Sequence, residues 1–375
     1  MPKQVIISVT SDLVTDQRVH RAASTLKENG YKVLVIGRRL PNSQDLPGKK
    51  YRCKRFRLWF HTGALFYAAY NLRLFRFLLF SKADILLSND LDTLPANYLA
   101  SKIKRIPLVY DSHEYFTGVP ELVNRPKVQR IWKRIEGMIL PGIQHAYTVN
   151  ESIAGLYRNE YNVAFESIRN VPEPRRFPKR DKELIRREFN LPADKKIVIL
   201  QGAGINIQRG AEEAVLAMQY LENVLLLIVG GGDVLPVLKK MVTEHHLSDK
   251  VRFEGKKPPG ELSFYTESAD LGLSLDKDTN LNYRFSLPNK LFDYIHAGIP
   301  VLASNLPEVR KIVEGYGIGS IAESHDPKEL AAKMNNMLHD PSNADQLKKN
   351  LEKAADELNW DRERIKLINI FKQLD

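Results

Sequence analysis

Short apolar segments alternate with amphipathic segments through the first half of the chain. The apolar segments have the composition of buried strands and lie at Val5–Val9, Val33–Ile36, Ile85–Ser88 and Leu108–Tyr110. Helical periodicity occurs at Asp16–Glu28, Thr93–Lys104 and Lys127–Ile139. Strands and helices that alternate in this way are typical of βαβ units. The pattern therefore predicts a parallel sheet with helices on both faces.

The alternation stops after Asn170, where proline and charged residues cluster from Val171 to Lys182, and then restarts. The later predicted strands are Ile197–Leu200, Val224–Val229, Val251–Phe253, Leu271–Leu275, Val301–Ala303 and Ile318–Ile321, with helical segments such as Ala211–Leu221 and Leu235–His245 between them. We predict two similar α/β domains, residues 1–172 and 173–357, and a closing helix over residues 358–375. Ligands of open parallel sheets bind outside the carboxyl ends of the strands, so two facing domains would form a ligand cleft.

The overall composition supports a folded, two-domain protein. The chain has 375 residues, of which 43% are hydrophobic and 27% are charged, which is long for one core and ordinary for two. Its single cysteine, Cys53, excludes an internal disulfide and a cysteine-based zinc cluster. Because the residues after Met1 lack the apolar core of a signal peptide, we expect a cytoplasmic location.

The formal net charge of +11 is concentrated between Leu46 and Ala83, a stretch that contains no Asp or Glu. Its basic residues are Lys49, Lys50, Arg52, Lys54, Arg55, Arg57, Arg73, Arg76 and Lys82, and many Leu and Phe residues lie among them. One interpretation is peripheral contact with an anionic membrane surface rather than with nucleic acid. The other is a core helix packed on the sheet with a solvated basic flank. Arg73 and Arg76 leave no uncharged stretch of about 20 residues that could span a membrane.

The segment from Ser286 to Ser304 carries the most informative local pattern. It predicts a polar loop, an amphipathic helix, a Gly-Ile-Pro turn and a buried strand. A helix start favours an anion, Lys290 adds a full positive charge, and Asp293 one turn later can accept hydrogen bonds from hydroxyl groups. These properties indicate a nucleotide-sugar site. The alternative is an ordinary αβ unit in which Lys290 and Asp293 are polar residues at a helix terminus and bind no ligand.

Five motifs, in this order and over nearly the whole chain, resemble the retaining glycosyltransferases of family 4, of the group 1 type. They are Asp16-Gln-Arg-Val19 with Gly30, Asp111-Ser-His-Glu114, Gly202-Ala-Gly204 with Arg209-Gly210, Gly230-Gly-Gly-Asp233, and Leu287-Pro-Asn-Lys-Leu-Phe-Asp293 through Ser304. The resemblance implies the GT-B fold: two Rossmann-like doubly wound domains facing across a cleft, with the C-terminal helix crossing back to the N-terminal domain. It also implies that the C-terminal domain binds a nucleoside-diphosphate sugar, that the N-terminal domain binds the acceptor, and that the donor's anomeric configuration is retained.

The sequence departs from that family at both of its characteristic glutamates, and it lacks the paired glycines that members often carry after the first strand. Family members carry two glutamates that flank seven residues; Asp293 stands at the second position and Phe285 at the first. The contact of the first glutamate with the transferred sugar must therefore come from other groups, such as the loop Asn282–Ser286, or be absent.

Transfer from a nucleotide sugar places growing negative charge on the departing diphosphate, which fixed cations stabilise. We predict this role for Arg209 and Lys290, with Asp293 as a third catalytic residue. The resemblance makes His113 the first choice for orienting donor or acceptor, with Glu114 and Asp111 as close alternatives. A neutral imidazole there could accept a proton or hydrogen-bond a sugar hydroxyl. The predicted donor-binding residues are Gly202, Gly204, Gly230, Gly232, Asp233, Gly255, Ser286, Leu287, Asn289 and Glu308.

Acidic residues that follow the predicted strands of the first domain are candidates for the acceptor site. The acceptor-binding set is Asp12, Asp16, Arg18, Asp90, Asp92 and Glu114. For Asp12, Asp16, Asp90 and Asp92, the favoured interpretation is nevertheless that they are helix caps and loop residues.

Two Asp-x-Asp sequences, Asp90-Leu-Asp92 and Asp276-Lys-Asp278, could hold Mg²⁺ or Mn²⁺. Because cationic side chains already neutralise the diphosphate, we predict no metal and no cofactor beyond the sugar donor itself. The predicted function is a metal-independent, hexosyl-type glycosyltransferase that acts on a saccharide or lipid-linked saccharide in cell-surface polysaccharide or glycolipid synthesis. The alternatives are a GT-B nucleotide-sugar epimerase and a non-catalytic nucleotide-sugar-binding protein.

Overall fold

The computed structural model describes residues 2–46, 48–174, 180–340 and 342–374. The chain divides into two compact units, Met1–Asn170 with Trp360–Asp375 and Val171–Asn359, which we call the first unit and the second unit. Residues 175–179, part of the proline-rich and charged segment predicted to separate the domains, lie outside the described residues, as does the end of the predicted closing helix at residue 375.

The first unit contains a seven-stranded parallel sheet with the strand order β3-β2-β1-β4-β5-β6-β7. Its strands are β1 (Gln4–Ser8), β2 (Lys32–Arg39), β3 (Arg52–Arg57), β4 (Ile85–Asn89), β5 (Leu108–Ser112), β6 (His145–Thr148) and β7 (Glu166–Ser167). In the central strand β1, Val5 pairs with Val33 on one side and with Ile85 on the other. Val5, Ile6 and Ile7 are all fully buried, as expected for a parallel strand covered on both faces.

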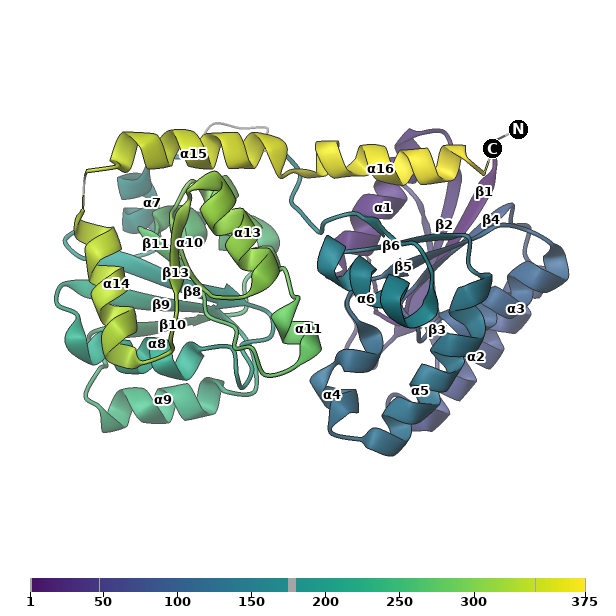
Figure 1. Cartoon of the computed structure of the whole chain (residues 1–375), viewed down its shortest axis with the longest axis horizontal. Coiled ribbons are helices and arrows are strands. Elements are labelled where there is room, and N and C mark those ends of the chain that lie inside the picture. The colour runs from purple at the N-terminus through teal and green to yellow at the C-terminus, as the bar shows by residue number, and fades with distance from the viewer. Residues whose placement is uncertain (1, 47, 175–179, 341, 375) are drawn as a thin grey trace. The chain divides into compact units, whose positions relative to one another are not determined.

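Helices cover both faces of this sheet (Figure 1). They are α1 (Gln17–Glu28), α2 (Gly63–Phe80), α3 (Leu94–Lys104), α4 (Pro120–Val123), α5 (Pro126–Ile139), α6 (Glu151–Tyr161) and α16 (Trp360–Lys372). The last helix packs on α1: the Trp360 indole N–H donates to the Thr25 hydroxyl at 2.9 Å. Phe371 meets the ring of Tyr31 at a centroid distance of 5.8 Å.

The basic stretch between Leu46 and Ala83 forms β3 and α2. Four apolar residues of α2 at four-residue spacing, Phe66, Tyr70, Leu74 and Leu78, are buried. The interpretation of a core-packed helix is therefore right for this face of α2. Among the described residues, no helix is long and apolar enough to cross a membrane.

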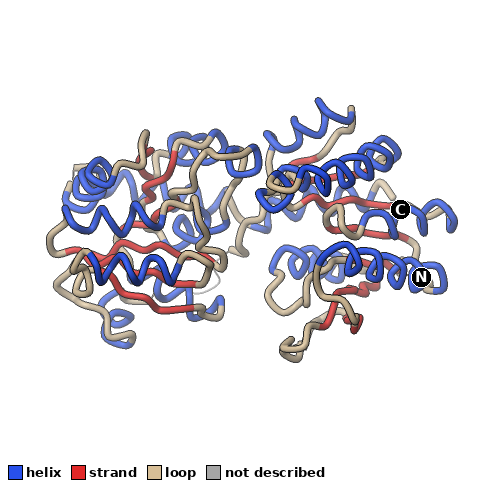
Figure 2. Tube along the Cα trace, turned by 90° about the horizontal axis from the view of Figure 1, so that it is seen from below, coloured by secondary structure: helices blue, strands red, loops and turns tan. Residues whose placement is uncertain are grey.

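The second unit contains a six-stranded parallel sheet with the order β10-β9-β8-β11-β12-β13. Its strands are β8 (Lys196–Gly202), β9 (Val224–Gly230), β10 (Val251–Gly255), β11 (Leu271–Ser274), β12 (Val301–Ser304) and β13 (Gly319–Ala322). Its helices are α7 (Lys182–Glu188), α8 (Ala211–Ala217), α9 (Leu235–Glu244), α10 (Pro259–Ser268), α11 (Leu281–Arg284), α12 (Asn289–Ala297), α13 (Pro307–Tyr316), α14 (Pro327–His339) and α15 (Ala344–Glu357). Apolar cores lie on both sides of the sheet, and Figure 2 shows the strands of each unit running between helices.

Both sheets have the strand order of a doubly wound Rossmann-like fold, which confirms the predicted fold class. The order reverses between β1 and β4 in the first unit and between β8 and β11 in the second. Side chains that follow the carboxyl ends of these strands lie where open α/β sheets bind ligands.

Candidate functional site

Two cations and one buried carboxylate meet at the reversal point of the second sheet. Arg209 lies in the loop between β8 and α8, Asp276 follows β11, and Lys290 lies in the first turn of α12. One oxygen of Asp276, Oδ1, accepts from Arg209 Nη1 at 3.0 Å, and the other, Oδ2, lies 3.0 Å from Lys290 Nζ. The Asp276 side chain is only 1% exposed. The structure thus brings together two residues predicted as catalytic and fixes both on one acid.

The Arg209 guanidinium is held from a second side and stays charged. It lies over the ring of Tyr283 at 4.9 Å from the centroid, within cation–π range. Burial acts to lower the pKa of Arg209, but Asp276 and Tyr283 outweigh burial and raise the pKa. The formal charge of Arg209, Asp276 and Lys290 together is +1, at the positive end of the α12 dipole.

Two glycine-containing loops pack against each other beside this cluster. The Gly231 N–H donates to the Gly202 carbonyl at 3.1 Å. A Cβ atom on Gly230 would lie 1.8 Å from the same carbonyl oxygen, and one on Gly232 would lie 2.1 Å from the carbonyl of Ile205. Glycine is therefore required at Gly230 and Gly232 by loop packing, whatever the ligand.

The other predicted donor residues are distributed around the same edge of the sheet. A Cβ atom on Gly204 would lie 3.6 Å from the Asn206 side-chain nitrogen, an ordinary contact distance, and Gly255 has a φ of +64 with nothing within 4 Å of its Cβ position. The exposed Asp233 uses its backbone N–H to donate to Asn206. Ser286 donates to the Tyr283 carbonyl, and Leu287 packs against the apolar core. The exposed Asn289 begins α12. The buried Glu308 lies in the first turn of α13 and pairs with Lys311.

Asp293 contacts the end of β8. Its carboxylate accepts from Gln201 Nε2 at 3.0 Å, and the carbonyl oxygen of the same Gln201 amide accepts from the Thr266 hydroxyl at 2.7 Å. This chain places Asp293 at the same sheet edge as the cation cluster. Its role in catalysis stays a prediction.

In the first unit, His113 lies between two carboxylates. Its Nδ1 is 3.1 Å from Asp90 Oδ2, and its Nε2 is 3.2 Å from Asp111 Oδ2. The buried Arg18 donates to both oxygens of Asp111 through Nε and Nη2 and to the carbonyl of Ile168 through Nη1. Asp90 and Asp111 come from the ends of β4 and β5, beside the reversal point.

The charges in this group of four residues change the expected role of His113. Burial acts to lower the pKa of His113, but Asp90 and Asp111 raise it to about 9. Burial acts to raise the pKa of Asp111, but Arg18 and His113 lower it to about 2. The expectation of a neutral imidazole is therefore wrong at neutral pH: His113 is a cation that donates hydrogen bonds rather than a base that accepts a proton.

The remaining predicted acceptor residues make mostly local contacts. Asp16 caps α1 by accepting from the Val19 N–H, and Asp12 accepts from the Val14 N–H and the Ser43 hydroxyl. These contacts agree with the favoured interpretation of both acids as cap and loop residues. The burial of Arg18 argues against the direct acceptor contact predicted for it, and Arg18 instead holds Asp111.

Asp92 and Glu114 differ in burial. Asp92 is buried and accepts from the Thr10 hydroxyl at 2.6 Å. Burial, and then the nearby Asp90, raise the pKa of Asp92 to about 7. Glu114 is exposed.

The sequence analysis did not predict that Asp276 would hold Arg209 and Lys290. Asp276 was considered only as half of an Asp-x-Asp metal motif, although an acid directly after a buried strand at a reversal point was a visible signal. Within the described ranges, no group of three or more His, Cys, Asp or Glu side chains is arranged to hold a metal ion. Metal independence stays a prediction.

Comparison with known proteins gives two family matches. The model for Glycosyl transferases group 1 matches residues 181–354, and the model for Glycosyltransferase Family 4 matches residues 16–174. A D-inositol 3-phosphate glycosyltransferase from Thermobispora bispora is 24% identical over 204 residues, which is 51% of this chain and 46% of that protein. The amylovoran biosynthesis glycosyltransferase AmsK of Erwinia amylovora is 29% identical over 105 residues, which is 28% of this chain and 26% of that protein. The matched regions thus span half or less of these relatives.

Solved structures of the same fold resemble nearly the whole chain. A sucrose-phosphate synthase from Thermosynechococcus elongatus has a TM-score of 0.78 at 18% identity, with 99% of each chain covered. Anabaena HepE in complex with UDP-glucose has a TM-score of 0.76 at 14% identity, with 99% of this chain and 100% of that chain covered. At such identities the likeness establishes the fold alone.

Proposed function

Because the chain belongs to the group 1 glycosyltransferases of GT-B fold, we propose that it transfers a hexose from a nucleoside-diphosphate sugar to a saccharide or lipid-linked saccharide, with retention of anomeric configuration. The observation that carries the proposal is the cluster of Arg209, Asp276 and Lys290 at the reversal point of the second sheet. Cations held rigidly in place before the reaction are what a departing diphosphate requires.

The cluster supports leaving-group stabilisation in preference to simple anion binding. When the bond from the anomeric carbon to the β-phosphate oxygen breaks, negative charge grows on the diphosphate. Arg209 and Lys290 need not reorganise at that moment, since Asp276 already holds both. In our proposal these two cations perform the neutralisation for which other enzymes use a metal ion.

The first unit supports recognition of neutral hydroxyl groups. The two cations Arg18 and His113 are balanced by the two carboxylates Asp90 and Asp111, so the formal charge of this group is zero. His113 is partly exposed, and we propose that its imidazolium positions a sugar hydroxyl of donor or acceptor. HepE, solved with UDP-glucose, and AmsK, named for amylovoran biosynthesis, support a nucleotide-sugar donor and a sugar acceptor. We place the activity in the cytoplasm, at the inner face of the cell membrane.

Ligand-induced thermal stabilisation tests the donor site first. A ligand that binds only the native state raises the melting temperature by an amount set by its concentration relative to its dissociation constant. Nucleoside diphosphates and their sugar conjugates should stabilise the native protein, and R209A should reduce the shift in melting temperature. The matched control is R284A, whose side chain is 3.8 Å from Asp278 and half exposed.

Turnover then separates the three candidate functions. A transferase forms a glycosylated product only when acceptor is added, and R209A or K290A should lower its kcat by about 100- to 1000-fold. Conversion of the donor sugar without acceptor would indicate an epimerase. A protein that binds the donor but neither forms a product nor hydrolyses the donor slowly would be a non-catalytic binding protein.

A further inference from the structure

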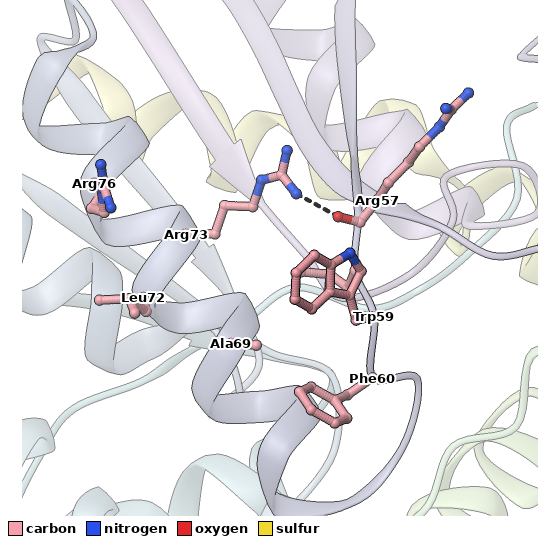
Figure 3. A pocket seen from close by; sticks show the side chains of 8 residues that line it. Arg57, Trp59, Phe60, Ala69, Leu72, Arg73 and Arg76 are labelled. Carbon is pink, nitrogen blue, oxygen red and sulfur yellow. Dashed lines mark hydrogen bonds between the residues drawn. The ribbon is translucent and has the colours of Figure 1, made fainter.

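Large apolar side chains are exposed beside arginines where β3 leads into α2. Trp59 is 96% exposed, and Phe60, Leu65, Leu72 and Phe80 are exposed as well. A hollow of about 490 Å³ lies here, lined by Trp59, Phe60 and Leu72 and by Arg57, Arg73 and Arg76 among others. Figure 3 shows the two aromatic rings beside α2. We call Arg57, Trp59, Phe60, Leu72, Arg73 and Arg76 the β3–α2 patch.

Packing of the first unit does not account for these exposed side chains. The opposite side of α2 supplies the core contacts, through Phe66, Tyr70, Leu74 and Leu78. Tyr70 also anchors the helix by donating to the carbonyl of Val9, the residue that follows β1, at 2.6 Å. The α2 residues of the patch therefore lie on the outer face of a helix whose inner face already holds it on the first unit. An exposed apolar patch that the fold does not need is typical of a binding surface.

The charge on the patch specifies an anionic partner. Between Leu46 and Ala83 the sequence holds nine Lys or Arg residues and no acid. Arg73 donates to the carbonyl of Arg57, as Figure 3 shows, and lies over the Phe56 ring at 5.0 Å. Within the part of the chain that the structure describes, Arg57 and Arg76 form no ion pair with an acid, so both are available to an outside anion.

The partner must also cover apolar groups. A nucleic acid would match the arginines but would leave Leu72 and Phe80 in water, and a second copy of the chain would bring the same positive charge. An anionic bilayer offers phosphates for the arginines, and its interface favours tryptophan, whose ring is apolar with one polar N–H.

We propose that the β3–α2 patch docks the first unit on an anionic bilayer, with Trp59 and Phe60 entering the interface and Arg57 and Arg76 contacting headgroup phosphates. This inference adds a docking surface to the proposed placement at the membrane. Its biological purpose rests on the proposed function, but its test does not, because vesicle binding is measured without turnover.

Tryptophan fluorescence provides a direct test. The chain has three tryptophans, and Trp132 and Trp360 are only 8% and 4% exposed, so a change of environment on docking reports Trp59. Phosphatidylcholine vesicles containing phosphatidylglycerol should shift the emission of the full chain to the blue at low salt, and brominated lipid should quench it. Pure phosphatidylcholine vesicles should give neither effect. W59F should lose both signals while it still co-sediments with the anionic vesicles.

Charge variants test the contribution of the arginines. R57E/R76E should lower the vesicle partition coefficient by about 30-fold or more, since each basic residue near an anionic surface contributes about fivefold. The control K348E/K349E makes the same charge change at two exposed positions of α15 in the second unit and should keep wild-type binding. F60S/L72S should weaken both sedimentation and the blue shift.

Three results would overturn the inference. The first is equal binding to neutral and anionic vesicles, and the second is an unshifted tryptophan emission on anionic vesicles. The third is DNA binding or self-association that is stronger than vesicle binding and is abolished by R57E/R76E or F60S/L72S. Donor hydrolysis, measured without vesicles, should be unchanged in R57E/R76E. Vesicle binding by a protein that shows no donor turnover would leave the docking surface in place and remove the proposed transferase activity instead.

Discussion

The substitution D276N tests whether the buried carboxylate positions the two cations at the proposed donor site. At about 3.0 Å each, the attraction of Asp276 to Arg209 and to Lys290 is about 5 kcal/mol per pair at an effective dielectric constant of about 20, before desolvation is subtracted. Removing one partner of a buried pair lowers the free energy of unfolding by about 3–5 kcal/mol. Because the Arg209 side chain is 32% exposed, we expect about 3 kcal/mol, measured by chemical denaturation.

The effects of D276N on binding and on catalysis should diverge. The formal charge of the cluster rises from +1 to +2, so a nucleoside diphosphate should bind as tightly as to the wild type or more tightly in calorimetry. The cations lose their fixed position, so kcat should fall by about 10- to 100-fold, which is part of the loss expected from removing a preorganised charge completely. Steady-state kinetics at saturating donor and acceptor measure that fall.

A matched control lies two residues away. Asp278 belongs to the same Asp-x-Asp sequence but is 46% exposed and lies 3.8 Å from Arg284, so D278N should keep stability within about 0.5 kcal/mol and nearly all of kcat. Unchanged kcat in D276N, or weaker diphosphate binding with normal kcat, would refute the positioning role. Equal damage in D276N and D278N, repaired by Mn²⁺, would instead identify the Asp-x-Asp sequence as a metal site.

Three further outcomes follow from the structure. The pKa of His113 is raised to about 9 from an ordinary value of about 6.5. Its contribution to stability is therefore complete below about pH 6.5 and is lost as pH rises through about 9. The melting temperature of the wild type should fall across that pH range, and the melting temperature of H113Q should lack this pH dependence. G230A should lower the free energy of unfolding by about 3 kcal/mol or more, since its Cβ would lie 1.8 Å from a carbonyl oxygen, whereas G255A, in open space at a φ of +64, should lose only about 1–2 kcal/mol in urea denaturation. Turnover in excess chelator should equal turnover without it, and a complete loss restored by Mn²⁺ would contradict the cation-cluster mechanism.

The sequence predicted the architecture well because buried parallel strands appear in it as continuous runs of apolar residues. It missed β3, β6 and β7 of the first sheet. In β3, Arg52–Arg57 is rich in charge and only Phe56 is buried, as an edge strand allows. The omission of β3 shifted the count: the strand before His113 is the fifth rather than the fourth, and Asp111 lies inside it.

The candidate site was only partly predictable, since a residue's chemistry depends on neighbours that are distant in sequence. Arg209 and Lys290 were identified from local motifs, but Asp276, which joins them, becomes meaningful only when β11 lies beside β8. The charge of His113 likewise depends on Asp90, 23 residues earlier in the chain. No periodicity or composition could show that two carboxylates flank this imidazole.

In both units a buried acid holds two cations, but the two groups differ in net charge, and this difference bears on the ligands proposed for them. In each unit a buried acid at the carboxyl end of a strand near the reversal point holds two cations: Asp111 holds Arg18 and His113, and Asp276 holds Arg209 and Lys290. Asp90 adds a second carboxylate in the first unit, so its group is neutral and suits uncharged hydroxyls. The described contacts of the second-unit cluster include no such compensating acid, and its surplus positive charge favours the diphosphate. This difference in charge supports the proposal that the second unit binds the donor and the first unit binds the acceptor.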